Sequence, residues 1–275
     1  MDVGVIGLGL VGGSIALNLS QDFAITGYDV DIGVRGEALA RGAIAQAATS
    51  LAAFSNVKLI FIATPPAAVV PTLVALAGTL RSDAVVTDCA GAKWSIVEAT
   101  LAQAPSIAPQ FVGGHPMAGR DQGGLGEARR SLFERAAWIL TPSEVTRPRA
   151  VEMVAGIIPT FGAYPVMMSP AEHDETVALL SHLPHVLAGM LVDMATSLRR
   201  SDVSAGSWSD LTRVAGADPV LWTDIVMANR RHLSATLETL GEKLLEIAPI
   251  IEAGDRDAIF QFFTNAKRAK DNTGR

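Results

Sequence analysis

Short, continuous apolar runs alternate with segments of helical periodicity from the start of the chain to about residue 168. Uninterrupted apolar runs of this length are typical of strands buried on both faces of a parallel sheet. The predicted strands are the run that begins at Val3 and residues 24–28, 58–63, 84–87, 111–113, 138–141 and 164–167. The predicted helices between them are residues 14–19, 33–41, 67–76, 95–101 and 150–158. This alternation predicts an α/β fold with a mostly parallel, doubly wound sheet over residues 1–168.

Strand patterns vanish after Pro170, and long helical patterns take their place. Helices are predicted over residues 172–181, 183–199, 218–247 and 256–267. In the third of these, apolar residues recur at three- and four-residue steps: Leu233, Leu237, Leu240, Leu244 and Ile247. These apolar faces exceed what one small helical domain needs for its own core. We therefore predict an all-α domain over residues 169–275 that binds the substrate and pairs with a second copy as a homodimer.

The first strand runs into a glycine-rich turn that is followed at once by a helix. Gly7, Gly9 and Gly12 form the spacing G-x-G-x-x-G in the strand–turn–helix context that a dinucleotide fingerprint requires. The first glycine allows a tight turn, the second lets the backbone approach a pyrophosphate, and the third lets the helix lie close to the strand. The helix N-terminus then directs its N–H groups at the phosphates. A Rossmann-like, dinucleotide-binding first domain is the resulting expectation.

An acidic residue, Asp29, ends the second predicted strand about 20 residues beyond the glycines. A carboxylate at this place accepts hydrogen bonds from the adenosine ribose and repels a 2′-phosphate, so the pattern indicates NAD rather than NADP. Ligands of such sheets lie beyond the carboxyl ends of the strands, where Thr64, Asp88 and the loop after Gly113 fall. The residues expected to bind the cofactor are Gly7, Leu8, Gly9, Leu10, Val11, Gly12, Asp29, Thr64 and Pro65.

Composition excludes several other classes of protein. The chain has 275 residues, of which 49% are hydrophobic and 18% charged, so a large core rather than disorder is expected. Its net charge is −6 and its one basic cluster, residues 267–270, is short, which argues against a nucleic-acid surface. A single cysteine, Cys89, excludes an internal disulfide and fits a reducing cytosol. Met1 leads directly into the first strand without a signal peptide, and no apolar run reaches the ~18 residues of a membrane helix. We expect a cytoplasmic protein without membrane contact.

One histidine, His115, lies between glycines and a proline at a predicted strand end that faces the cofactor cleft. An imidazole takes up a proton near neutral pH, so His115 is the candidate general base. The alternative is a loop histidine that caps or packs.

Two more histidines, His182 and His185, lie at the junction of two predicted helices, beside Ser181. Together with His173 and Asp174 they offer metal-ligand residue types, but the spacing H-E-x-x-H is absent and the cysteine is remote, so we expect no metal. At least one of the two histidines is expected to be structural.

Arg213 lies near a predicted helix start in a weakly charged segment. A guanidinium there can bind a carboxylate through two parallel hydrogen bonds. Its alternative is a surface ion pair with Asp210.

These motifs together resemble the prephenate/arogenate dehydrogenase family of tyrosine biosynthesis. The resemblance runs nearly end to end and is carried by the glycine turn, Val86-Thr87-Asp88, the segment from Gly113 to Gly119, the segment from Ser181 to His185, and Asp210-Leu211-Thr212-Arg213. It implies a helical dimerisation domain and NAD-dependent oxidative decarboxylation of prephenate, arogenate or both. It further implies that His115 assists deprotonation of the ring hydroxyl, that Arg213 holds the ring carboxylate, and that His185 lies near the substrate side chain.

Two positions bear on how far this resemblance extends. The family commonly has a serine that touches the catalytic histidine, and this chain has Gly91 there, which leaves the orientation of the histidine open. Asp121 lies in the loop after His115 and would attract the ammonium group of arogenate if it faced the substrate. Ser181, His185, Arg213 and Asp121 are the expected substrate-binding residues.

Three alternatives remain at this point. The chain could be an arogenate-specific enzyme, or an NAD-linked dehydrogenase of the β-hydroxyacid or imine-reducing type. Those enzymes usually depend on a lysine in the second domain, and residues 170–222 contain none. The third alternative is an NAD-binding regulatory dimer without catalysis, which Gly91 would favour.

Overall fold

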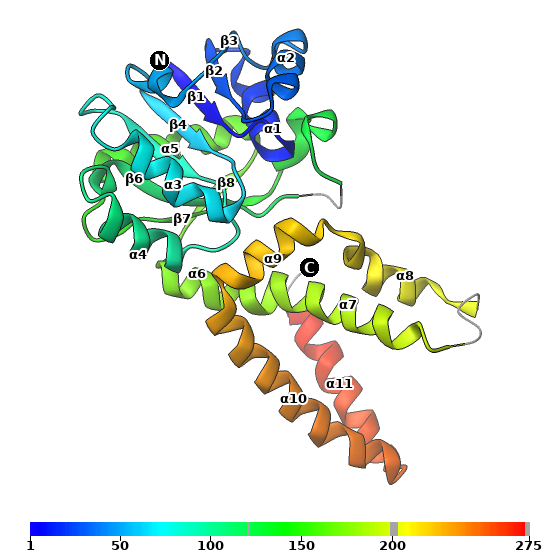
Figure 1. Ribbon diagram of the computed structural model, residues 1–275. Coiled ribbons are helices and arrows are strands. Elements are labelled where there is room, and N and C mark those ends of the chain that lie inside the picture. Colours follow the sequence, from blue (N-terminus) through cyan, green and yellow to red (C-terminus); the bar gives the residue numbers. More distant parts are fainter. Residues whose placement is uncertain (120–121, 199–202, 273–275) are drawn as a thin grey trace. The chain divides into compact units, whose positions relative to one another are not determined.

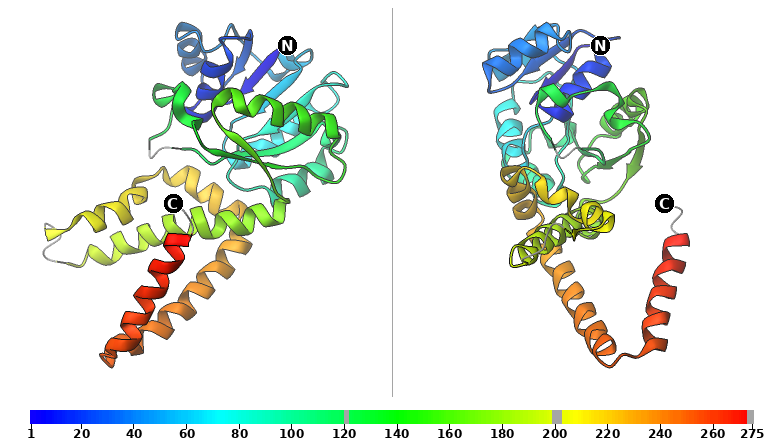
Figure 2. Two further views of the ribbon diagram at one scale, coloured as in Figure 1. Left: turned by 180° about the vertical axis from the view of Figure 1, so that it is seen from behind. Right: turned by 90° about the vertical axis from the view of Figure 1, so that its right-hand side faces the viewer.

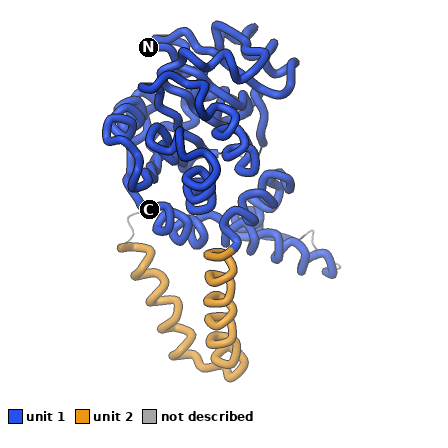
Figure 3. The backbone as a smooth tube through the Cα atoms, turned by 60° about the vertical axis from the view of Figure 1, so that its left-hand side comes forward, with its two compact units in different colours: residues 1–230 blue, residues 231–275 orange. Residues whose placement is uncertain are grey.

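The computed structural model describes residues 1–119, 122–198 and 203–272. Contacts divide the chain into two compact units, Met1–Arg230 and Arg231–Arg275 (Figure 3).

One twisted sheet forms the centre of the first unit (Figure 1). Its strand order is β3-β2-β1-β4-β5-β6-β7-β8. The strands are β1 (Val3–Ile6), β2 (Ile25–Tyr28), β3 (Gln46–Ala47), β4 (Leu59–Ile62), β5 (Val85–Asp88), β6 (Phe111–Pro116), β7 (Ala137–Thr141) and β8 (Tyr164–Met167). The first six strands in this order, from β3 across to β6, are parallel to one another. Strand β7 is antiparallel to β6, and β8 is parallel to β7. The order reverses between β1 and β4, which places a ligand crevice at their carboxyl ends.

Helices cover both faces of this sheet, as the alternating pattern predicted (Figure 2). One apolar cluster packs α1 (Leu10–Leu19), α2 (Ile32–Ala40) and α5 (Pro148–Ile157) on the first face. A second cluster packs α3 (Pro66–Leu76) and α4 (Trp94–Gln103) on the other. The predicted doubly wound α/β fold is confirmed. Short 3₁₀ turns fill the connections at Leu51–Phe54, Ala108–Gln110, Leu125–Glu127, Arg130–Phe133 and Ile158–Phe161.

Strand β6 is longer than predicted and contains His115. The sequence predicted that the strand ends at Gly113 and that His115 lies in a loop. In the structure, β6 continues to Pro116 because its second half pairs with the antiparallel strand β7, where His115 faces Ile139 in register. Residues 113–116 of β6 pair with β7 and not with β5, so their strand conformation depends on this antiparallel neighbour. His115 is therefore held on a rigid element rather than on a loop.

Helices also follow the last strand within the first unit. They are α6 (Pro170–Val177), a π-helical turn (Ala178–His182), α7 (Leu183–Ala195), α8 (Gly206–Thr212), a 3₁₀ turn (Arg213–Gly216) and α9 (Pro219–Ala228). Helix α6 packs against α4, and α9 packs against α3, so these helices belong to the same compact unit as the sheet. The boundary at residue 168 marks a change of architecture and stays a prediction as a boundary between domains.

The helix predicted over residues 218–247 is interrupted, and this expectation is wrong. Helix α9 ends at Ala228, and α10 (Arg230–Glu252) begins after Asn229, whose φ and ψ are −114° and 24°. Asn229 is buried, and its side-chain amide donates to the Asp174 carbonyl oxygen at 2.7 Å. This tertiary hydrogen bond holds Asn229 at the break between the two helices and has no signature in the apolar periodicity.

One helical stretch, Pro170–Ala195, has the length and composition to cross a membrane, with a mean hydropathy of 1.5. It is not an uninterrupted apolar run of the kind that the sequence was expected to lack, because Ser181, His182 and His185 lie within it. The stretch also carries His173, Asp174 and His182, which are buried and hydrogen-bonded inside the first unit. In this structure it therefore acts as a packing helix of that unit.

The second unit consists of the rest of α10 and α11 (Arg256–Asn272), joined by a turn at Gly254 with φ +65° (Figure 3). Large apolar side chains are exposed on this unit: Leu244, Leu245, Ile251, Phe260, Phe262 and Phe263. The predicted helix over residues 256–267 is found and extends to Asn272.

Candidate active site

The glycine-rich turn between β1 and α1 is closed by contacts that only glycine permits. Gly7 has φ +88°, and a Cβ atom there would lie 2.5 Å from the Ala63 carbonyl oxygen. A Cβ atom on Gly12 would overlap the Gly7 carbonyl oxygen, so the helix lies directly against the strand end. At Gly9, by contrast, nothing lies within 4 Å of a Cβ position. The turn is tightly packed on one side and open at Gly9.

Unsatisfied polar groups surround this open side. Helix α1 begins at Leu10, and its N-cap residue, Gly9, supplies no side-chain hydrogen bond. The backbone N–H groups of the first turn, including those of Leu10 and Val11, therefore have no intrahelical partner. Thr64 lies after β4, and its Oγ1 is buried without a hydrogen-bond partner in the described structure. Pro65 follows as the N-cap of α3. Open space, a helix N-terminus and an orphaned hydroxyl fit a phosphate-containing ligand such as a dinucleotide.

Asp29 is tied to the glycine turn itself. Its carboxylate accepts hydrogen bonds from the Leu8 N–H at 2.8 Å and the Asp31 N–H at 3.0 Å. Leu8 thus shapes the turn, and its N–H is already bound. Arg35 of α2 lies over the Tyr28 ring, 5.6 Å from its centroid, and donates to the Ala48 carbonyl oxygen. The Asp29 side chain itself lies against the glycine turn through the bond from Leu8.

Replacing Asp29 by Ser is expected to lower kcat/KM for NAD roughly 10- to 100-fold, because charge-assisted hydrogen bonds worth about 1.5–3 kcal/mol are lost. The same change is expected to raise kcat/KM for NADP, since the repulsion of a 2′-phosphate is removed. Steady-state rates with both cofactors measure the two effects, with Asp22→Ser as an exposed control on the preceding connection. Equal kcat/KM values for NADP and NAD in the unmodified enzyme would contradict the prediction that Asp29 selects NAD.

A fully buried ion pair lies at the end of β5. The Lys93 ammonium group contacts the Asp88 carboxylate, and both side chains have 0% exposure. Asp88 also accepts hydrogen bonds from the N–H groups of Ala90 and Gly114, each at 3.0 Å. Because Gly114 precedes His115 on β6, the pair fixes the backbone that carries the candidate base.

Three ionisable side chains form a continuous hydrogen-bonded chain beside this pair. His115 Nδ1 lies 2.8 Å from His173 Nε2, and His173 Nδ1 lies 2.7 Å from Asp174 Oδ1. The two rings meet edge to face, with centroids 5.0 Å apart. Asp174 also accepts the backbone N–H groups of Lys93 at 2.7 Å and Trp94 at 3.0 Å, at the start of α4. Helix α6 thus brings His173 and Asp174 against the ends of β5 and β6.

His182 extends this network toward the helical side of the site. Its Nδ1 accepts from the Asn229 side-chain amide at 3.2 Å, and its ring also makes a hydrogen bond with the Gly91 backbone. His182 is 1% exposed, so its part in this structure is to hold the Gly91 loop.

Gly91 lies beside the imidazole of His115. A Cβ atom at Gly91 would be 3.8 Å from His115 Nε2 and 3.8 Å from Ile225 Cγ1 on α9. A serine at this position would reach the histidine, whereas the glycine leaves the Nε2 edge of the ring without that hydroxyl. In this structure the ring is held from its Nδ1 edge by His173.

The three histidines of the network are held in their neutral form. Burial, then the neighbouring His173 and Lys93, holds the pKa of His115 well below its ordinary 6.5. Burial also lowers the pKa of His173 against the opposing effect of Asp174. The pKa of His182 falls to about 4, again mainly through burial. A neutral imidazole is the form that can accept a proton at physiological pH.

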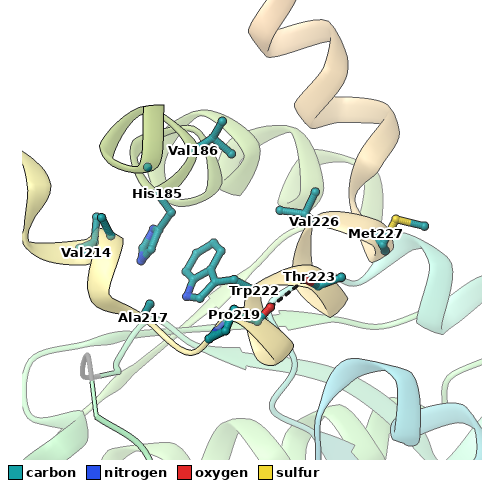
Figure 4. Close-up of a pocket in the computed structure, with 11 residues that line it drawn as sticks. His185, Val186, Val214, Ala217, Pro219, Trp222, Thr223, Val226 and Met227 are labelled. Carbon is teal, nitrogen blue, oxygen red and sulfur yellow. Dashed lines mark hydrogen bonds between the residues drawn. The ribbon is translucent and has the colours of Figure 1, made fainter. Parts of the chain in front are cut away.

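A cavity of about 380 Å³ lies between α7, the 3₁₀ turn Arg213–Gly216 and α9 (Figure 4). His185 stacks on Trp222 at its wall, with ring centroids 3.5 Å apart and an interplanar angle of 21°. Trp222 also meets the His182 ring edge to face at 6.0 Å. Most of the remaining lining is apolar: Val186, Gly189, Val214, Ala215, Ala217, Pro219, Thr223, Val226 and Met227. This wall suits a flat hydrophobic ring.

Two of the other predicted substrate-binding residues, Ser181 and Arg213, lie near this cavity, and the third, Asp121, is not among the described residues. The Ser181 carbonyl oxygen accepts from His185 Nδ1 at 2.9 Å, so Ser181 orients that imidazole. Arg213 is exposed, and it is both the C-cap of α8 and the first residue of the 3₁₀ turn Arg213–Gly216, next to the lining residues Val214 and Ala215.

Among the described residues, no group of three or more His, Cys, Asp or Glu side chains is arranged to hold a metal ion. His173, Asp174 and His182, considered above as ligand types, are instead hydrogen-bonded to His115, to the start of α4 and to Asn229.

Sequence reasoning missed the roles of Lys93, His173, Asp174 and Asn229. Lys93 stands in an apolar context five residues after a strand-terminal aspartate, and this pattern could have suggested a buried pair. His173 and Asp174 were noticed only as metal-ligand types, because nothing in their spacing indicates a contact with residues 58 to 81 positions earlier.

Comparisons with known proteins identify the family of the chain. The family models described as "Prephenate dehydrogenase, nucleotide-binding domain" and "Prephenate dehydrogenase, dimerization domain" match residues 15–167 and 169–265. A prephenate dehydrogenase of Bacillus subtilis (strain 168) is 33% identical, over 96% of this chain and 74% of its own length.

Two solved structures resemble the chain over almost its full length. One is prephenate dehydrogenase from A. aeolicus in complex with hydroxyphenyl propionate and NAD+, with a TM-score of 0.90, 27% identity, and coverage of 98% of this chain and 97% of that one. The other is Synechocystis arogenate dehydrogenase, with a TM-score of 0.85, 28% identity and 99% coverage of each chain. With both family models and an end-to-end relative in agreement, the chain belongs to the prephenate dehydrogenase family, whose members are NAD-dependent oxidoreductases.

Proposed function

We propose that this chain catalyses the NAD-dependent oxidative decarboxylation of prephenate, of arogenate, or of both, to 4-hydroxyphenylpyruvate or tyrosine. The observation that carries the proposal is a neutral His115 on a rigid strand, backed at Nδ1 by His173 and placed at the carboxyl edge of the sheet that carries the dinucleotide turn. Family membership sets aside the β-hydroxyacid and imine-type alternatives.

The residues present support each step of this reaction. The glycine turn, Asp29 and Thr64 would hold NAD, which when bound supplies a hydride acceptor for the substrate ring carbon that bears the hydroxyl. His115 takes the hydroxyl proton as that carbon is oxidised and returns it to the oxygen once the ring is aromatic. The ring carboxylate leaves as carbon dioxide, and formation of the aromatic ring drives its loss. The stacked pair His185 and Trp222 would face the ring or its side chain.

The direct test is the appearance of NADH absorbance when prephenate or arogenate is added to the enzyme with NAD. We expect turnover with at least one substrate, and the ratio of the two kcat/KM values assigns the preference. Absence of turnover with both would overturn the proposal and favour a regulatory NAD-binding protein.

We expect Arg213→Ala to raise the KM for substrate about 10-fold or more, with a smaller change in kcat. A guanidinium that binds the ring carboxylate contributes mostly to ground-state binding, and a charged hydrogen bond contributes about 1.5–3 kcal/mol. Initial rates over a range of substrate concentrations measure the effect, with Arg268→Ala on α11 as the control. An unchanged KM would show that Arg213 does not bind the substrate carboxylate and is only a surface residue.

The proposal includes a homodimer formed through the helical segment, in the cytoplasm. Support comes from the dimerisation-domain match and from the exposed apolar side chains of α10 and α11. Sedimentation equilibrium is expected to give twice the chain mass of 28.8 kDa, and Phe260→Asp with Phe263→Asp is expected to shift it toward the monomer. A monomer in the unmodified protein would refute this part.

A further inference from the structure

His173 lies at the centre of the site, although it touches neither the glycine turn nor the apolar cavity. It has 0% exposure and is fixed on both edges of its ring. One edge faces Asp174 Oδ1 at 2.7 Å, and the other faces His115 Nδ1 at 2.8 Å. A buried imidazole with two close partners has only a few allowed placements of its proton.

The partners of Asp174 decide where that proton lies. Both carboxylate oxygens of Asp174 already accept backbone N–H groups, from Lys93 and Trp94. The carboxylate therefore acts as an acceptor toward His173, and His173 Nδ1 must carry the hydrogen. A neutral His173 then has a lone pair on Nε2, so the hydrogen between the two rings belongs to His115 Nδ1. His115 Nε2, the nitrogen beside Gly91, is left without a proton.

We propose that His173 is a positioning residue that fixes the tautomer of His115 and so leaves the Nε2 lone pair as the proton acceptor. This inference rests on the proposed function, because it assigns the means by which the base of that reaction is oriented. It also accounts for the tolerance of Gly91, since the ring is oriented from its Nδ1 edge and no hydroxyl is needed at position 91.

The electrostatic surroundings support the neutral state that this arrangement needs. The charged and titratable groups around the two rings are Lys93 and Asp88 at the end of β5, Asp174 on α6 and His182 on the π-helical turn. Burial and the Lys93 cation lower the pKa of both His115 and His173, which keeps both rings neutral at pH 7.

Nitrogen-15 NMR of the imidazole side chains tests the tautomer without any substrate. The chain has five histidines, so single histidine variants suffice to assign the signals. In the unmodified protein at pH 7, we expect His115 to show a protonated Nδ1 and an unprotonated Nε2. In His173→Leu, we expect this single tautomer to give way to a mixture. A protonated Nε2 on His115 in the unmodified protein would overturn the proposal, whatever its activity.

Kinetics of two substitutions separate positioning from packing. His173→Leu removes the acceptor and is expected to lower kcat about 10- to 100-fold, a part of the 10²–10⁴ that a positioned general base contributes. The KM for substrate and the Kd for NAD are expected to stay within about threefold. His173→Gln keeps an acceptor oxygen near the position of Nε2 and is expected to recover most of the lost kcat. His232→Gln on α10 serves as the control.

Equal losses in both variants, with the His115 tautomer unchanged, would show that His173 only packs and would overturn the proposal. If His173→Leu does not fold, the tautomer of the unmodified protein and the rate of His173→Gln still decide it. Failure of the proposed function is a separate result: the unmodified enzyme would turn over neither substrate, while the NMR signals would still report the state of His115.

Discussion

The variant His115→Asn is expected to bind NAD with unchanged affinity and to lose roughly 10²–10⁴ in kcat, the usual contribution of a positioned general base. Asparagine fits the position on β6 and can keep one hydrogen bond to His173, but it cannot take a proton from the substrate hydroxyl. Cofactor affinity is measured by calorimetry and kcat by NADH formation, with His232→Asn as the control. Turnover near that of the unmodified enzyme would mean that His115 is not the base.

The pH dependence of the unmodified enzyme is a second test of His115 as the general base. The working base is the neutral imidazole, so activity is lost as pH falls through the pKa of His115. Burial with His173 and Lys93 nearby holds that pKa well below 6.5. We therefore expect kcat/KM, which reports groups of the free enzyme, to remain level down to pH 6.5 and to fall only at more acid pH. A fall centred above pH 6.5 would contradict the assignment.

Replacing Lys93 by Met is expected to lower the free energy of unfolding by about 3–5 kcal/mol, the usual effect of breaking a buried pair and leaving one charge uncompensated. Methionine fills similar volume, so the loss reports the charge rather than a cavity. The Asp88 carboxylate would retain only the backbone N–H groups of Ala90 and Gly114 as partners. Urea unfolding followed by circular dichroism at pH 7 measures the change.

The chain offers a matched control for this experiment. Lys58 pairs with Asp83 at the amino ends of β4 and β5, the opposite edge of the sheet from Asp88, and their side chains are 27% and 49% exposed. Lys58→Met is therefore expected to change the free energy of unfolding by less than about 1 kcal/mol. If both lysine variants were equally stable, the burial of the Lys93–Asp88 pair would have no energetic weight, and its part in fixing the His115 backbone would need another explanation.

Local pattern predicted seven of the eight described strands, all except the two-residue β3, because each of the seven is a short apolar run. Each glycine of the turn likewise has a local reason. Gly7 and Gly12 lie so close to neighbouring backbone atoms that no side chain fits, and the spacing of the glycines in the sequence is enough to predict this requirement. The family resemblance that the sequence motifs indicated is confirmed by the comparisons. Local pattern did not predict the ends of elements that have partners from elsewhere in the chain. Strand β7 pairs with β6 past Gly113, and Asp174 and His182 hold the side chain of Asn229 at the break between α9 and α10.

The sequence by itself determined the doubly wound sheet, the dinucleotide turn with Asp29, and His115 as the residue of interest, since periodicity and glycine spacing act over short distances along the chain. Only the tertiary structure decided which groups surround His115. Lys93, His173 and Asp174 are brought together by the packing of α6 against α4 and by the register of β5 and β6. A hydrogen bond between residues 58 positions apart, such as that between His115 and His173, depends on the whole fold and leaves no local pattern.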